Sequence, residues 1–349
     1  MNSYHFRIAI GIAIAAVCAF LPIINLNGSI SRTEPSEDIR SRFSTPDTFD
    51  IEYPNDAEPS ESLVELGRTL FFDTRLSRSQ SQSCATCHDP NRGFSDGLQI
   101  SVGDKGNPLN RHTPNIYNLA WNESFLWDGR SQSLEQQALM PIQSPEEMDL
   151  DLDTLIQRLS GVPAYREAFS QAFGSEEIDS SKIAQAIAAF ERTLIVDDTP
   201  FDKYLQGDTL AISPEAKRGM VLFAEKAKCI LCHDGPNLTD NSFHNIGLIG
   251  SDLGRAAHIN DPTLRGAFKV PGLRNLSLTA PYMHDGSLAT LEEVIEFYNR
   301  GGDDAENKSK LIQALNLSDL EKRDLLAFLE TLNQPLKIEP PKNLFGDSD

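Results

Sequence analysis

Apolar residues in the body of the chain recur at helical rather than strand spacing. Within 61–72, Leu63, Leu66 and Leu70 fall on one face of a helix. The same period recurs in 153–172 and 180–195, and helix-start signals stand at Ser213-Pro214, 290–293 and 318–321. Strand-type alternation is scarce, and the intervening segments are rich in Gly, Pro and Asn. The pattern predicts a mostly helical protein with long loops.

The first 27 residues carry an export pattern. Arg7 precedes an apolar run from Ile8 to about Ile24, whose length lies between a signal-peptide core and a membrane span. A cleaved signal peptide, an uncleaved anchor and a lipoprotein lipidated at Cys18 are the alternatives, and each sends the body of the protein into the periplasm. Residues 28–58 are rich in Ser, Pro, Asp and Glu without a period, which predicts a flexible tether.

Composition and charge narrow the function classes. The 349 residues suggest about two domains. Lys and Arg number 31 against 51 Asp and Glu, so the formal net charge is −20. This balance argues against nucleic acid or an anionic membrane surface as the main partner, because both attract basic faces, whereas a basic protein partner remains compatible. The 5 cysteines are too few for a disulfide scaffold.

The cysteines outside the export segment form two C-x-x-C-H motifs, at 84–88 and 229–233. This spacing lets Cys84 and Cys87, and likewise Cys229 and Cys232, add to the two vinyl groups of one haem each. The adjacent His88 and His233 then reach the iron as proximal ligands. A redox dithiol or half of a zinc site is the alternative, but a zinc site needs more Cys or His close by. The motifs predict two covalently bound haem c groups.

The two motifs lie in a duplicated unit. An apolar helix with a glycine precedes each motif, at Gly67–Phe72 and Gly219–Phe223, and a His-Asp pair follows the second cysteine of each. This predicts two cytochrome c-like lobes, each carrying one c-type haem. The predicted boundaries are an N-terminal lobe at 59–205, a C-terminal lobe at 206–335 and a tail at 336–349.

Further short stretches accompany the haem motifs. They are residues 70–73 with 76–77, 84–90, 111–114 with Asn118, 125–130, 133–138, 145–148, 252–255, 268–275 and 281–286. With these stretches the sequence resembles the bacterial di-haem cytochrome c peroxidases and their relatives of the MauG type. The resemblance runs from about Leu63 to about Leu332, which is most of the chain beyond the export segment and tether.

The resemblance implies a division of labour between the lobes. Hydrogen peroxide reacts at the N-terminal haem, and the C-terminal haem relays electrons. Family position makes Glu147 the acid/base group, with Pro141 shaping the same pocket; a solvated loop pair with Glu146 is the alternative. Trp127 corresponds to the family's tryptophan between the haems, although a core aromatic is also compatible.

Two arginines have weaker assignments. The resemblance implies that Arg130 and Arg255 pair with haem propionates, and surface salt bridges are the alternative for each.

The sequence departs from the peroxidases that need reductive activation in two places. The loop 101–106 lacks their distal His, with Asp104 near its place, so the N-terminal iron should be open without a loop shift. Tyr298 stands where those peroxidases have a methionine ligand to the C-terminal iron, as in MauG. Met283 is the competing ligand, and simple aromatic packing is the third alternative for Tyr298.

The resemblance also implies a calcium ion between the lobes, held in part by the carbonyls of Thr279 and Pro281. His112 stands where many relatives have an asparagine ligand, which puts the ion in doubt because calcium prefers oxygen. His244 and His284 are expected to form hydrogen bonds near the haems rather than ligate iron, and His258 is expected at the surface.

Three function classes follow. The first is a peroxidase that reduces hydrogen peroxide with electrons from a small cytochrome c or cupredoxin. The second is a MauG-like enzyme that oxidises a protein substrate, and the third is a di-haem cytochrome that only transfers electrons. Glu147, Pro141 and Trp127 count against the third class, and a cytochrome c peroxidase is the conservative expectation. The sequence leaves open a membrane anchor and a homodimer.

Overall fold

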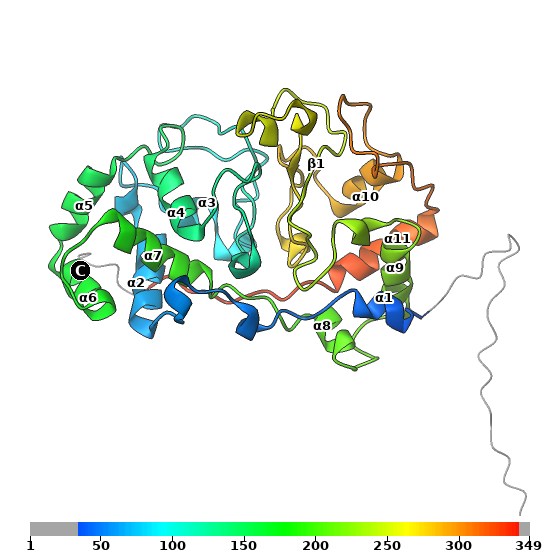
Figure 1. Cartoon of the computed structure of the whole chain (residues 1–349), viewed down its shortest axis with the longest axis horizontal. Helices are drawn as coiled ribbons and strands as arrows, with labels where there is room; N and C mark the ends of the chain where they lie inside the picture. The colour runs from blue at the N-terminus through cyan, green and yellow to red at the C-terminus, as the bar shows by residue number, and fades with distance from the viewer. Residues whose placement is uncertain (1–33, 342–349) are drawn as a thin grey trace, which may run out of the picture.

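The computed structural model describes residues 34–341, which form two mainly helical lobes side by side (Figure 1). The predicted export segment lies outside the described residues. The N-terminal lobe contains α2 (Glu61–Phe72), α3 (Cys84–Cys87), α4 (Leu134–Gln143), α5 (Leu152–Ser160), α6 (Pro163–Phe173) and α7 (Ser180–Glu191). The C-terminal lobe contains α8 (Pro200–Leu205), α9 (Pro214–Ala224), α10 (Leu291–Asn299) and α11 (Asp319–Glu330). The prediction of a mostly helical protein is confirmed.

Strand structure in the described part of the chain is confined to a short antiparallel pair, β1 (Phe243–His244) and β2 (Phe268–Lys269). Among residues 34–341, no helix combines the length and the apolar character that crossing a membrane requires.

The helices begin at polar caps that the sequence supplies. Ser60 accepts a hydrogen bond from the Leu63 amide at the start of α2, and Ser213 does the same for Ala216 at the start of α9. Ser318 forms a capping box with Glu321 at the start of α11. These caps satisfy amide groups that have no partner within the helix, so they define where each helix starts.

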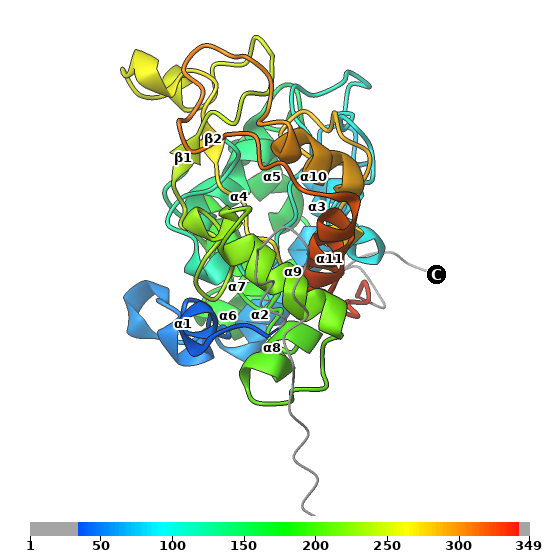
Figure 2. The same ribbon diagram turned by 90° about the vertical axis from the view of Figure 1, so that its right-hand side faces the viewer.

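Each lobe is built on one close helix pair that crosses at a glycine. A Cβ atom placed on Gly67 of α2 would lie 1.8 Å from the carbonyl oxygen of Ala186 in α7. A Cβ on Gly219 of α9 would lie 1.9 Å from the carbonyl oxygen of Asp324 in α11. Figure 2 shows α9 and α11 side by side. The duplicated glycine in the sequence is therefore the residue that lets the two helices of each pair touch.

The N-terminal segment is part of the fold as far as it is described, and the prediction of a flexible tether is wrong for residues 34–58. This segment contains α1 (Glu37–Ser41), and Ile39 and Phe43 lie in the core of the C-terminal lobe. The Phe43 ring packs edge-on against Phe201 with centroids 5.3 Å apart. Polar residues separate the few apolar ones in this segment, so the sequence shows no helical period there. For this reason the burial of Ile39 and Phe43 could not be predicted.

The lobes divide before α8 rather than at residue 205. Phe201 and Tyr204 of α8 belong to the core of the C-terminal lobe. Asp202 is fully buried and forms a bidentate ion pair with Arg274, with N–O distances of 2.7 and 2.8 Å. The boundary lies at residues 197–200, Asp-Asp-Thr-Pro, where the chain passes from the N-terminal to the C-terminal lobe.

Both ends of the described chain cross between the lobes (Figure 1). The N-terminal segment starts on the C-terminal lobe and runs to α2. The C-terminal segment leaves α11 and returns to the N-terminal lobe, where Leu336 and Ile338 pack on its core and Arg68 donates to the carbonyl of Glu339. The predicted tail therefore lies on the N-terminal lobe as far as it is described.

We predict that Phe43→Ala lowers the free energy of unfolding by about 3–5 kcal/mol, because the ring is only 5% exposed and its loss leaves a cavity. Phe49→Ala in the same segment is the control, since that side chain is 95% exposed and its loss should change stability little. Chemical denaturation of both variants measures the difference. Equal stability of the two would show that the segment is not part of the C-terminal core.

Candidate functional site

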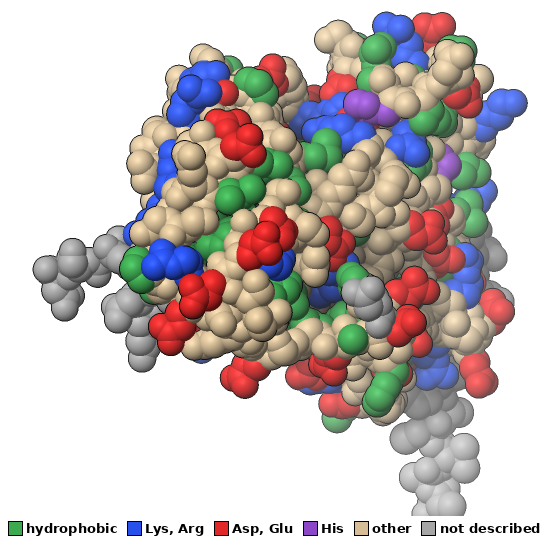
Figure 3. Space-filling model, turned by 60° about the vertical axis from the view of Figure 1, so that its left-hand side comes forward, with side chains coloured by type: hydrophobic (Ala, Val, Ile, Leu, Met, Phe, Trp, Pro, Cys, Tyr) green, Lys and Arg blue, Asp and Glu red, His purple; other side chains and the backbone are tan. Residues whose placement is uncertain are grey.

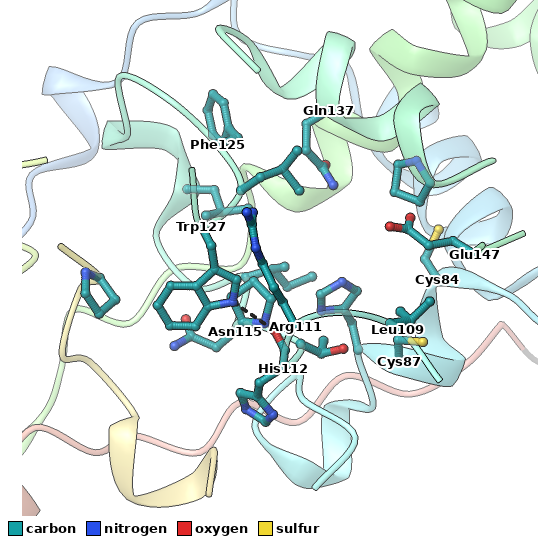
Figure 4. Close-up of a pocket in the computed structure, with 18 of the residues that line it drawn as sticks. Cys84, Cys87, Leu109, Arg111, His112, Asn115, Phe125, Trp127, Gln137 and Glu147 are labelled. Atoms are coloured by element: carbon teal, nitrogen blue, oxygen red, sulfur yellow. Dashed lines mark hydrogen bonds between the residues drawn. The ribbon is translucent and has the colours of Figure 1, made fainter. Parts of the chain in front are cut away.

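A cavity of about 660 Å³ opens in the N-terminal lobe and reaches the C-terminal lobe. The first haem motif lines it, together with Pro141, Glu147, Arg130 and Trp127. Figure 4 shows Cys84, Cys87 and Glu147 toward one side of this cavity and Trp127, Arg111 and His112 toward the other. The structure therefore brings together the first haem motif and the residues that the resemblance assigned to the reactive haem, Glu147, Pro141 and Trp127.

The local fold prepares His88 to bind iron. The motif cysteines form the short helix α3, and His88 follows it directly. His88 Nδ1 donates to the Phe94 carbonyl at 3.1 Å, so Nε2 is the nitrogen that would bind iron. Burial lowers the pKa of His88, which favours the neutral form of the ring that a ligand requires.

The second motif repeats this arrangement. His233 Nδ1 donates to the Leu238 carbonyl at 2.8 Å, and burial lowers the pKa of this ring as well. The acceptor residues Phe94 and Leu238 both have left-handed backbone conformations, with φ of 56° and 52°. The four motif thiols are free and the two imidazoles are oriented, so the residues present fit two covalently attached haem groups.

Glu147 lies on a tight loop directly after α4. The Glu147 amide donates to Ser144, and the next amide, of Met148, donates to the Pro141 carbonyl at 3.1 Å. Glu147 is half-buried, whereas its neighbour Glu146 is exposed. Burial raises the pKa of Glu147, and the charge of Arg130 lowers it in part. A carboxyl group with a raised pKa beside a haem site is suited to proton transfer.

Trp127 is held by both lobes. Its indole nitrogen donates to the His112 carbonyl at 2.8 Å, and its own carbonyl accepts from the Lys269 amide at 2.8 Å (Figure 4). The ring lies 6.5 Å from that of His284, centroid to centroid, in an edge-on arrangement. His284 in turn stacks on Phe268 with centroids 3.6 Å apart. The tryptophan thus stands where the lobes meet, in contact with aromatic groups of the C-terminal lobe.

Asp128, next to Trp127, is a buried junction that the sequence analysis did not identify. This fully buried carboxylate accepts from Arg111 at 2.5 Å, Arg130 at 2.7 Å and His258 at 3.0 Å. Burial alone would raise the pKa of Asp128, but the hydrogen bonds and charges of the two arginines bring it below its usual value. His258 is exposed, as expected, and also belongs to this inter-lobe network.

The two arginines assigned to propionates differ in their surroundings. Arg130 lines the cavity, so a propionate role stays compatible with its position. Arg255 donates to the carbonyls of Asp128 and Gly129, and its guanidinium lies 4.5 Å from the Phe243 ring centroid. These contacts show Arg255 joining the lobes.

Basic side chains and a histidine gather in the hollow between the lobes on the face that Figure 3 shows, while acidic side chains are scattered over the rest of that face. On this face the acidic side chains are spread over both lobes, whereas the hollow between the lobes is lined by basic ones.

Tyr298 lies on α10 near the second haem motif. Burial raises the pKa of its hydroxyl, and the neighbouring Cys229 and Cys232 add to this effect. Met283, the competing candidate, lies on the 281–286 loop with φ of 73°. The structure therefore places Tyr298 within electrostatic reach of the thiols that would hold the second haem.

Two buried groups near the first haem site were missed. Glu191 lines the cavity, its Oε2 atom has no hydrogen-bond partner within residues 34–341, and burial raises its pKa to about 8. Lys269 lines the same cavity from the C-terminal lobe, and burial lowers its pKa to about 8. Glu191 lies one helical turn after the buried Ile187 and therefore on the same apolar face, so a charged residue at this position is the sequence signal that could have identified it.

The side chains of His112 and Thr279, two residues of the predicted calcium site, bond to backbone carbonyls. His112 Nδ1 donates to the Leu98 carbonyl at 2.9 Å, and Thr279 Oγ1 donates to the Leu276 carbonyl. Calcium at the carbonyls of Thr279 and Pro281 stays a prediction. Cys232, Asp240 and His244 have ligand atoms within 4.8 Å of one another, but the Cys232 thiol belongs to the second haem motif.

Comparisons with known proteins agree with this arrangement. The family model described as di-haem cytochrome c peroxidase matches residues 61–210. The chain is 47% identical over 309 residues to methylamine utilization protein MauG of Methylorubrum extorquens, covering 87% of each protein. It is 37% identical over 292 residues to cytochrome c551 peroxidase of Nitrosomonas europaea, covering 80% of this chain and 84% of that one.

A solved structure extends the likeness to three dimensions. The crystal structure of a MauG-like protein associated with microbial copper homeostasis has a TM-score of 0.76 at 36% identity, covering 81% of this chain and 92% of that one. The protein therefore belongs to the family of di-haem cytochrome c peroxidases and MauG proteins, which are oxidoreductases with two c-type haems.

Proposed function

We propose that this protein is a periplasmic enzyme that reduces hydrogen peroxide in its N-terminal lobe. The electrons enter through the C-terminal haem from a small redox protein, a cytochrome c or a cupredoxin. The observation that carries the proposal is that Glu147 and the first haem motif line one cavity and that burial raises the pKa of Glu147. A cytochrome that only transfers electrons has no use for such a group.

The residues of the N-terminal cavity have separate tasks. A haem held by Cys84, Cys87 and His88 would supply the iron at which the peroxide bond is broken. The Glu147 carboxylate takes a proton from one peroxide oxygen and returns it to the other, which leaves as water. Each peroxide consumes two electrons and two protons and gives two waters. Pro141 restricts the space beside Glu147, and Arg130 holds a propionate.

Electrons must pass from the C-terminal lobe to this cavity, and Trp127 is the group that spans the boundary. Its indole bonds to His112 in one lobe and its backbone carbonyl to Lys269 in the other, so the residue is held where the lobes meet. We assign to Trp127 the transfer of electrons between the haems.

A second candidate is a MauG-like reaction, in which a protein side chain supplies the electrons and becomes oxidised. The position of Tyr298 beside the second haem motif favours this candidate, since a phenolate ligand stabilises oxidised iron more than a thioether does. The 47% identity to a MauG protein points the same way. Turnover of peroxide with reduced cytochrome c, measured beside trapping of oxidised protein partners, separates the two candidates.

We predict that Glu147→Gln slows the reaction with peroxide on the order of 10²-fold or more while both haems stay bound, because an amide keeps the shape but cannot carry the proton. The base works in its ionised form, so the wild-type rate should rise as the pH increases through a pKa above the usual range of a glutamate. The rate of the variant should not show this rise with pH. Stopped-flow kinetics across pH measure both effects.

Glu146→Gln is the matched control, because this neighbour carries the same group on the same loop but is exposed to solvent. Its rate should stay close to that of the wild type and the rise with pH should persist, displaced toward lower pH because the charge of Glu146 helps to raise the pKa of Glu147. Wild-type kinetics in the Glu147 variant would remove Glu147 from the mechanism.

We further predict that the oxidised protein has one high-spin and one low-spin ferric haem and reacts with peroxide without prior reduction. Tyr298→Phe should alter the low-spin signal in electron paramagnetic resonance, whereas Met283→Leu should not. An altered low-spin signal in the Met283 variant alone would show that the tyrosine assignment is wrong. Two low-spin haems that need an added electron would show that a further ligand closes the N-terminal iron.

A further inference from the structure

The loop 101–106 lies directly against the loop that carries Glu147. The Asp104 amide donates to the Glu147 carbonyl at 2.7 Å, and Lys105 Nζ donates to the Pro145 carbonyl at 3.3 Å. A Cβ atom on Gly103 would lie 1.8 Å from the Glu146 carbonyl oxygen. Since that contact is with backbone, any side chain at position 103 requires the Glu146–Glu147 segment to move.

The side chain of Asp104 anchors this loop to the segment that leads into the first haem motif. Its Oδ2 atom accepts from the Ser79 amide at 3.0 Å, and its other oxygen accepts from the Ser79 hydroxyl. Both carboxylate oxygens are therefore bonded to Ser79, and the Asp104 backbone amide remains directed at Glu147. Ser79 stands only five residues before Cys84, so this contact links the 101–106 loop to the start of the first haem motif.

The same segment also holds the far side of the Glu147 loop. The Arg78 amide donates to the Met148 carbonyl at 2.9 Å, and the Arg78 side chain donates to the Asp149 carbonyl at 2.8 Å. Asp149 has a left-handed backbone with φ of 52°, and Lys105 of the 101–106 loop pairs with its carboxylate at 2.9 Å. Residues on both sides of Glu147 are thus bonded to two neighbouring loops.

We propose that Gly103 and Asp104 are positioning residues for Glu147. Gly103 permits the 101–106 loop to approach the Glu147 loop closely. Asp104 holds the two loops together, because its side chain accepts from Ser79 and its amide donates to the Glu147 carbonyl. The carboxyl group of Glu147 is thereby held in the cavity at a fixed place relative to Cys84 and Cys87. This inference rests on the proposed role of Glu147 in the peroxide reaction.

Four single variants test the proposal. Gly103→Ala and Asp104→Ala should each slow the peroxide reaction on the order of 10²-fold, as expected for a misplaced catalytic group, and should shift the pH at which the rate rises. Asp104→Asn should stay close to the wild type, because an amide can keep both contacts to Ser79. Gly250→Ala is the control, since a Cβ there meets no atom within 4 Å. Haem content and ferric spectra should be unchanged in all four.

The deciding measurement combines Gly103→Ala with Glu147→Gln. If Gly103 acts through Glu147, the double variant is no slower than Glu147→Gln alone, whereas a further loss equal to that of the single variant overturns the proposal. If Asp104→Asn is as slow as Asp104→Ala, the charge of Asp104 acts by itself and its positioning role is wrong. Should Gly103→Ala fail to bind haem, the two Asp104 variants decide.

The outcomes also separate this inference from the proposed function. Slow Glu147→Gln with wild-type rates and pH profiles for both Gly103→Ala and Asp104→Ala leaves the function in place and removes the positioning role. Unchanged kinetics in Glu147→Gln overturn the catalytic role of Glu147 and the positioning proposal together.

Discussion

The rest of the structure depends on the close contact of two helices at a glycine in each lobe. At Gly67 and Gly219 the backbones of the paired helices touch, and no other residue type fits without moving one helix. The contact fixes the direction in which α2 and α9 end, and each of these helices leads into a haem motif. Close packing of this kind tolerates little displacement, so the two motifs are presented on rigid supports.

The lobes meet at a buried carboxylate, Asp128. Asp128 joins Arg111 and Arg130 of its own lobe to His258 of the other. Removing one member of such a buried network leaves an uncompensated charge, which costs much more than the net value of the network. The network therefore acts mainly to set the orientation of the lobes, and Trp127 directly precedes Asp128 in the chain. The group that we assign to electron transfer is placed by the interaction that holds the lobes together.

Local patterns in the sequence predicted the helices well, because helices depend on residues close together in the chain. The helix that begins after Ser60 is an example. The role of residues 34–58 was not predictable, because Ile39 and Phe43 find their partners more than a hundred residues away. Asp128 escaped notice for the same reason, since one of its partners is in the other lobe. The family resemblance identified Glu147, but nothing local to Glu147 shows that the 101–106 loop holds it.

The duplicated frame gives both haem motifs the same support, so the difference between the two sites must arise outside it. Each motif histidine donates to the carbonyl of a residue with a left-handed backbone, and burial lowers the pKa of both rings. What differs is the side that faces each motif. The first motif shares its cavity with Glu147, which lies on a loop, and the second lies near Tyr298, which lies on the helix α10. A loop can present a proton-transfer group beside open space, whereas a helix presents a side chain at a fixed distance suited to ligation. The two haem motifs therefore differ in the kind of element that carries the nearby polar side chain, a loop for Glu147 and the helix α10 for Tyr298.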